Sequence, residues 1–281
     1  MADEIEYVVI PAENKPKCPR LDKIECKSLP SLPATFLVLG SCGSGKSSIL
    51  WSLLTNGYVM GKGKKSVFHE AIIYLGTLDA KSAFEKLPIE NSLVLDEFEP
   101  STFEAYQDDL KKHQMERLEK GKPMLNTLLV FDDFVNAGLM KKSAANKAPP
   151  IEKLALTSRH ESNCTIFFCS QVYKNSGFTT PTVRNNITTF IVSRMSRNEI
   201  YKIADELAED YEVDEWIAHY DLAMASDPYT FVVLDRRRPM PDRWTIKFST
   251  PFPPSKKSVE MKKLMSSRRS SVSSASSSGS D

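Results

Sequence analysis

The stretch Gly40-Ser41-Cys42-Gly43-Ser44-Gly45-Lys46-Ser47, called the phosphate loop below, decides the predicted fold of this chain. It follows the apolar run TFLVL at 35–39 and opens onto Ser48 and the apolar residues 49–51, which predicts a strand, a loop and a helix. The glycine spacing lets successive backbone N–H groups converge on nucleotide phosphates at the positive end of that helix. Lys46 is then expected to reach the β- and γ-phosphates, and Ser47 to hold Mg²⁺. We therefore expect residues 40–48 to bind a nucleoside triphosphate.

A second apolar run, TLLVF at 127–131, ends in Asp132 and Asp133. At the carboxyl end of a central strand, Asp132 can bind Mg²⁺ opposite Ser47, and Asp133 can orient the attacking water or accept its proton. Two aspartates after a strand also occur in plain turns, but the preceding phosphate loop favours the catalytic interpretation. A further strand, at 71–75, lies between the two motifs in the chain. Such a strand is typical of NTPases that carry a catalytic acid, rather than of simple kinases and GTPases.

A third apolar run, CTIFFC at 164–169, is followed by Ser170 and Gln171. An uncharged amide at this edge of a sheet can bond the γ-phosphate or the attacking water and so report nucleotide state. The alternative is a strand-end amide bonded only to backbone. The guanine-binding pattern Asn-Lys-x-Asp is absent, since residues 146–149 read Asn-Lys-Ala-Pro. ATP is therefore favoured over GTP.

Alternation of strands and helices predicts an α/β fold, with a central, mainly parallel sheet flanked by helices, of the P-loop type that carries an additional strand and a catalytic acid. We expect three segments. Residues 1–32 contain four prolines and are predicted to be an irregular arm, residues 33–250 form the ATPase domain, and residues 251–281 are a disordered, basic, serine-rich tail.

The composition is that of a globular protein, with 281 residues of which 41% are hydrophobic and 26% charged. No apolar run approaches the roughly 18 residues of a membrane span, and the acidic start is unlike a secretory signal, so we expect an intracellular protein without a membrane span.

The five cysteines include no C-x-x-C pair, which favours reduced thiols. The net charge of +1 requires any DNA contact to come from a local basic surface.

The motifs together resemble the poxvirus-type viral DNA-packaging ATPases of large eukaryotic DNA viruses and virophages, within the FtsK/HerA-like superfamily of P-loop NTPases. The resemblance covers about residues 33–195. It is carried by the phosphate loop, Asp132-Asp133, Ser158-Arg159-His160, Ser170-Gln171 and Arg184-Asn185-Asn186-Ile187-Thr188. It implies a ring of five or six subunits that hydrolyses ATP with Mg²⁺ and pumps double-stranded DNA into a preformed viral capsid, with a capsid component as partner.

The resemblance also implies catalytic roles. Gln171 corresponds to the sensor, and an arginine supplied by the neighbouring subunit is expected to complete the site. Arg159 and Arg184 are the candidates for this trans-acting arginine, with Arg194 and Arg197 as further possibilities that the sequence does not separate. An arginine in this role is worth ~10³-fold or more in rate.

Downstream, Arg236-Arg237-Arg238 lies between two predicted strands, at 230–234 and 244–248. Three arginines at a hairpin tip are a candidate contact with DNA phosphates, and a solvated turn is the alternative.

Two other functions remain open. A nucleotide or polynucleotide kinase would share the phosphate loop but needs a phosphate-accepting substrate, and Asp133, Gln171 and the arginines argue against it. A nucleotide-gated scaffold that does not hydrolyse ATP is disfavoured because Lys46, Ser47 and both aspartates are intact.

Overall fold

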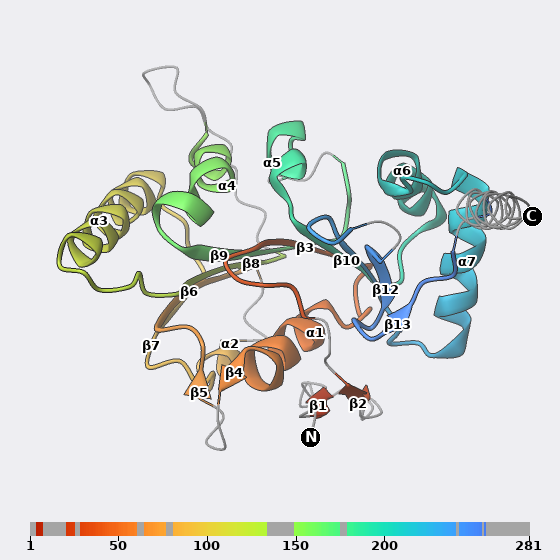
Figure 1. The fold of residues 1–281 in the computed structure, drawn as a ribbon, viewed down its shortest axis with the longest axis horizontal. Helices are drawn as coiled ribbons and strands as arrows, with labels where there is room; N and C mark the ends of the chain where they lie inside the picture. Colours follow the sequence, from red (N-terminus) through yellow and green to blue (C-terminus); the bar gives the residue numbers. More distant parts are fainter. Residues whose placement is uncertain are drawn as a thin grey trace, which may run out of the picture.

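The computed structural model describes residues 4–7, 21–25, 29–60, 65–76, 81–133, 149–174, 179–239, 242–254 and 256. Nine strands of this part of the chain form one sheet in the order β13-β12-β11-β10-β3-β9-β8-β6-β7 (Figure 1). The strands are β3 (Thr35–Leu39), β6 (Glu70–Leu75), β7 (Asn91–Leu95), β8 (Thr127–Asp132), β9 (Cys164–Ser170), β10 (Thr189–Val192), β11 (Val232–Asp235), β12 (Trp244–Ile246) and β13 (Thr250–Pro251). Pairing is parallel from β10 to β7 and antiparallel from β10 to β13. The predicted α/β class with a mainly parallel sheet is confirmed.

Helices cover both faces of this sheet. The helices are α1 (Lys46–Ser52), continued by the π-helix η1 (Leu53–Gly57), then α2 (Lys81–Phe84), α3 (Pro100–Glu119), α4 (Pro150–Glu161), α5 (Pro181–Asn186), α6 (Arg197–Leu207) and α7 (Val213–Ser226). In Figure 1, α1 and α2 lie on one face, and α3, α4, α5 and α6 lie on the other. Successive residues of β3 accordingly enter different cores, with Leu37 packing on the α3–α7 side and Phe36 on the α1 side. Both faces of the strand are buried, in keeping with its apolar residues 36–39.

The order of the central strands places the sequence motifs together. β9 pairs with both β3 and β8, although it follows both of them in the chain. The strand predicted at 71–75 is β6, which lies on the far side of β8 from β3. Parallel strands end at the same sheet edge, so the phosphate loop after β3, Gln171 after β9 and Asp133 after β8 come from adjacent strand ends.

Both end segments contain described elements that the sequence does not predict. The segment expected to be an irregular arm contains β1 (Glu4–Tyr7) and β2 (Leu21–Glu25), which pair antiparallel. At the other end, Pro251 belongs to β13, and the buried Phe252 ring packs near Trp216 and Trp244. The packed part therefore extends past residue 250, because this aromatic ring completes an aromatic cluster. The rest of the predicted tail, from 257, lies outside the described residues.

A small antiparallel pair of strands, β4 (Val59–Met60) and β5 (Lys65–Ser66), follows η1.

Within the described part of the chain, no helix has both the length and the apolar character to cross a membrane.

Candidate functional site

The phosphate loop is fixed between the ends of two strands. The Gly40 N–H donates to the Ser170 carbonyl (3.1 Å), and the Ser41 N–H donates to the Arg194 carbonyl (2.8 Å). A Cβ at Gly40 would lie 2.1 Å from the Ser44 Oγ, so any larger residue there would displace the Ser44 side chain. Gly45 caps α1 with a φ of 90°, which an L side chain rarely adopts. The glycines that the motif requires thus have identifiable steric reasons.

Three predicted catalytic side chains meet at one oxygen. The Oδ2 of Asp133 lies 3.2 Å from the Lys46 Nζ and accepts a hydrogen bond of 3.2 Å from the Gln171 Nε2. Lys46 also lies within 3.4 Å of the Ser41 carbonyl, inside its own loop. Its side chain is only 5% exposed, so its charge requires a counter-charge, and the Asp133 carboxylate provides one. Asp133 is 27% exposed, which leaves its carboxylate accessible to water.

Asp133 also has an unusual backbone conformation, with a φ of 48°. Aspartate tolerates this left-handed region better than most residues. The conformation follows directly after the last residue of β8, where the chain must leave the sheet. The side chains of Asp132 and Asp133 therefore separate, and Asp132 turns to Ser47 while Asp133 turns to Lys46.

Ser47 and Asp132 form the second half of the site. The Ser47 Oγ donates to the Asp132 Oδ2 at 2.7 Å, while the Asp132 Oδ1 is buried without a hydrogen-bond partner. Burial is the main cause that raises the pKa of the Asp132 carboxyl above its ordinary value, and the Ser47 hydrogen bond opposes it. A hard divalent cation prefers oxygen ligands, and a carboxylate with a hydroxyl beside it supplies two. These residues therefore fit Mg²⁺, which would satisfy the orphaned oxygen.

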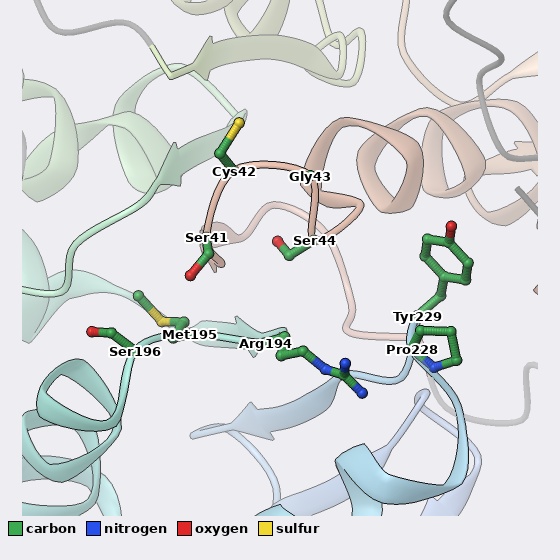
Figure 2. Close-up of a pocket in the computed structure, with 9 residues that line it drawn as sticks. All are labelled: Ser41, Cys42, Gly43, Ser44, Arg194, Met195, Ser196, Pro228 and Tyr229. Atoms are coloured by element: carbon green, nitrogen blue, oxygen red, sulfur yellow. The ribbon is translucent and has the colours of Figure 1, made fainter. Parts of the chain in front are cut away.

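A pocket of about 440 Å³ opens on the other flank of the phosphate loop (Figure 2). Residues 41–44 form one wall, and the opposite walls come from residues 194–196, after β10, and from Pro228 and Tyr229, before β11. The sequence indicates Arg194 only as a possible trans-acting arginine and does not indicate Pro228 or Tyr229. No motif marks these two residues, and only the position of β11 in the sheet brings them to the loop.

The two candidate arginines have different surroundings. Arg184 is engaged within its own chain, because its Nε lies 3.0 Å from Glu206 and its Nη1 donates to the Thr179 carbonyl at 2.6 Å. By contrast, the Arg159 Nε is buried without a hydrogen-bond partner, and burial, with a smaller contribution from Arg237, lowers the pKa of Arg159.

Neither candidate arginine lies at its own phosphate loop. Arg159 is in the last turn of α4, which precedes the start of β9, whereas the phosphate loop follows the end of β3. Arg184 is in α5, close to the start of β10. Of the further possibilities, Arg197 is paired with Asp221 at 2.6 Å, and Arg194 alone borders the loop of its own chain.

The three arginines of the predicted hairpin tip also bind their own chain. Arg236 donates to the Arg184 carbonyl (3.2 Å) and Arg237 to the Pro33 carbonyl (3.1 Å), while the Arg238 Nε lies 3.5 Å from Asp235. The β11–β12 hairpin exists as predicted. However, some N–H donors of its arginines bind carbonyl groups near the starts of β3 and β10 and are not free for DNA phosphates.

Comparisons with solved structures find chains of similar fold. B204, the DNA-packaging ATPase from Sulfolobus Turreted Icosahedral Virus, is 16% identical with a TM-score of 0.50, over 78% of this chain and 98% of that one. The pCW3 conjugation coupling protein TcpA is 17% identical over 84% of this chain and 64% of its own, with a TM-score of 0.47. EssC from Geobacillus thermodenitrificans is 15% identical over 78% of this chain and 38% of its own, with a TM-score of 0.46.

The chain therefore has a P-loop ATPase fold that it shares with a viral DNA-packaging ATPase, in agreement with the resemblance seen in the sequence. No protein-family model matches the sequence, and no curated protein matches it.

Proposed function

We propose that this chain is a Mg²⁺-dependent ATPase that translocates double-stranded DNA into a viral capsid. One observation carries the ATPase part: Lys46, Asp133 and Gln171 converge on a single carboxylate oxygen beside the Ser47–Asp132 pair. Phosphoryl transfer to water requires a cation that binds the phosphates, a carboxylate that activates the water, and oxygen ligands that hold a metal.

Each side chain of the site has a separate role that follows from its position. Backbone N–H groups of the phosphate loop and the Lys46 ammonium bind the phosphates. The Asp133 carboxylate is 27% exposed, and it holds the attacking water and accepts its proton. Gln171 donates a hydrogen bond to the Asp133 Oδ2 and in this way helps to orient the same water. Ser47 and Asp132 would hold Mg²⁺, which would supply positive charge to the nucleotide phosphates.

The DNA-packaging part rests on the sequence motifs and on the fold shared with B204, which is itself described as a DNA-packaging ATPase. Assembly into a ring of five or six subunits rests on the resemblance of the motifs. Arg159 lies away from the phosphate loop of its own chain, and its Nε makes no hydrogen bond. Arg184, by contrast, is bonded to Glu206 and to the Thr179 carbonyl. We therefore favour Arg159 as the trans-acting residue. A capsid component is the expected further partner.

The test is steady-state ATP turnover with Mg²⁺, measured without DNA, with short duplexes and with duplexes of several kilobases. The proposal predicts turnover that rises with duplex length, since a translocase remains engaged for longer on longer DNA. Lys46→Ala is the inactive control. Turnover indifferent to DNA would contradict translocation, phosphate transfer to a small acceptor would indicate a kinase, and ATP binding without turnover would indicate a nucleotide-gated scaffold.

A further inference from the structure

The pocket beside the phosphate loop lies on the flank opposite to the catalytic groups. Asp133 and Gln171 follow β8 and β9, which lie on one side of β3, whereas residues 194–196 follow β10 on its other side. A nucleotide whose terminal phosphate faces Asp133 must direct the rest of the molecule elsewhere. The pocket of about 440 Å³ on the β10 side is large enough to take a nucleoside.

Tyr229 presents an aromatic ring at this pocket. A Cβ built on Gly45 would lie 3.6 Å from the Tyr229 Cδ1, so the ring is next to the residue that caps α1. The ring is half-buried and packs against the core on the α1 side of the sheet. Figure 2 shows Tyr229 and Pro228 side by side at one end of the pocket, on the side of Ser44.

The loop that carries this ring is held in place. The Tyr229 N–H donates to the Asp227 Oδ1 at 2.9 Å, and the other oxygen of Asp227 accepts from the Lys247 Nζ at 2.6 Å. Pro228 restricts the backbone between them. The backbone that carries the ring is therefore positioned before any ligand arrives, which reduces the entropic cost of binding a flat molecule against the ring.

Arg194 contributes polar groups at the same pocket. Its Nη2 donates to the Met224 carbonyl at 2.9 Å, while its own carbonyl accepts from Ser41 in the phosphate loop. A guanidinium has five N–H donors, so this bond leaves further donors for ribose or base acceptors. Figure 2 shows the side chain extending along the pocket toward Pro228.

We propose that this pocket is the nucleoside subsite, in which the Tyr229 ring stacks on the nucleobase and supplies the base-dependent part of nucleotide affinity. The inference rests on the proposed function, because it assigns the phosphates to Lys46 and Ser47. Stacking on an aromatic ring accepts any base, since every base has a π-face. Tyr229 is therefore expected to distinguish nucleotides from bare phosphate chains more strongly than it distinguishes adenine from guanine.

The experiment compares ATP with inorganic tripolyphosphate, which has the phosphates but no base. Dissociation constants for both, with Mg²⁺, are measured by calorimetry or competition for the wild-type chain, Tyr229→Leu and Tyr229→Phe. Leucine retains apolar bulk but lacks an aromatic face, and phenylalanine keeps that face. Tyr201→Leu, on the exposed surface of α6, is the matched control.

Stacking is worth roughly 5- to 100-fold in affinity per base. We expect Tyr229→Leu to weaken ATP binding by a factor in that range and to leave tripolyphosphate binding within about twofold, with Tyr229→Phe and Tyr201→Leu near wild type. Unchanged ATP affinity in Tyr229→Leu would overturn the inference. Equal loss of both ligands would also overturn it, because Tyr229 would then only support the loop. A wild-type chain that binds neither ligand would instead refute the ATP site itself.

Discussion

The Lys46 Nζ and the Asp133 Oδ2 lie 3.2 Å apart, so the cation expected to bind phosphate and the acid expected to activate water form one ion pair. If a nucleotide phosphate binds Lys46 as proposed, it competes with this carboxylate for the ammonium. We expect such binding to weaken the hold of Lys46 on Asp133 and to make the carboxylate available to water. In this arrangement, one side chain would couple nucleotide binding to the readiness of Asp133.

Lys46→Ala is expected to remove tight ATP binding, because it deletes the buried cation at the phosphate loop. A hydrogen bond from a charged group contributes about 1.5–3 kcal/mol, so the dissociation constant should rise roughly 10- to 100-fold. Equilibrium binding of ATP with Mg²⁺ measures this change. Lys120→Ala, at an exposed lysine near the end of α3, should bind as the wild type does. Similar affinities for both variants would exclude Lys46 from the phosphate site.

Asp132→Asn is expected to stabilise the nucleotide-free protein while it impairs Mg²⁺-dependent turnover. Burial raises the pKa of the Asp132 carboxyl, so the folded state binds its proton more tightly than the unfolded state does. Stability contributed by this group is therefore lost as pH rises from about 4, the unfolded value, through the raised folded value. Asparagine carries no charge and can still accept from Ser47.

Thermal unfolding between pH 5 and pH 8 checks this expectation. The midpoint of Asp132→Asn should exceed that of the wild type by a few degrees at pH 8, since about 1 kcal/mol corresponds to ~2–4 °C in a domain of this size. The difference should shrink toward pH 5. A lower midpoint for the variant at pH 8 would show that the ionised carboxylate is stabilised by its surroundings rather than strained by burial.

Gln171→Ala is expected to separate catalysis from binding. The amide contacts Asp133 rather than the phosphate loop, so ATP affinity should stay within about threefold, while turnover should fall roughly 100-fold, as for the loss of one oriented donor. Gln107→Ala, on α3, is the matched control. Full turnover in Gln171→Ala would make this residue the strand-end amide that sequence analysis kept as the alternative.

The arginine variants should differ in stability as well as in activity. Arg184→Ala removes contacts to Glu206 and to the Thr179 carbonyl, so we expect it to lower the unfolding midpoint by several degrees. Arg159→Ala should leave the midpoint near wild type, bind ATP normally and hydrolyse it about 10³-fold more slowly.

Mixing Arg159→Ala with Lys46→Ala subunits should restore part of the turnover. At some interfaces, an intact phosphate loop from the first variant would meet an intact arginine from the second. Demonstrated subunit exchange without any rescue would contradict a trans-acting Arg159.

Much of the candidate site is predictable because its parts follow apolar strands. Lys46, Asp133 and Gln171 each come soon after such a run, and parallel strands end at one edge of a sheet, so their proximity follows from the pattern. What the pattern does not contain is the pairing order. That β9 separates β3 from β8 depends on contacts between distant segments, which local periodicity does not encode.

Residues whose importance depends on those distant contacts were missed. Tyr229 precedes β11 and has no motif around it, yet the antiparallel pairing of β11 with β10 carries it to the phosphate loop. The resemblance makes Arg184 a candidate trans-acting arginine, and no motif in the sequence indicates that Glu206, in a different helix, is its ion-pair partner. The sequence places Phe252 in the tail because the apolar pattern ends at Pro251, although the ring is buried.

The central claim, that Asp133 activates water at an ATP site formed by Lys46 and Ser47, is tested most directly by Asp133→Asn. Nucleotide affinity and phosphate release are measured on the same preparation, with Mg²⁺ and saturating ATP. Because Asp132 and the phosphate loop are unaltered, we expect ATP to bind at least as tightly as in the wild type, while phosphate release falls roughly 10²- to 10⁴-fold. Undiminished phosphate release from Asp133→Asn, with ATP bound, would contradict the account.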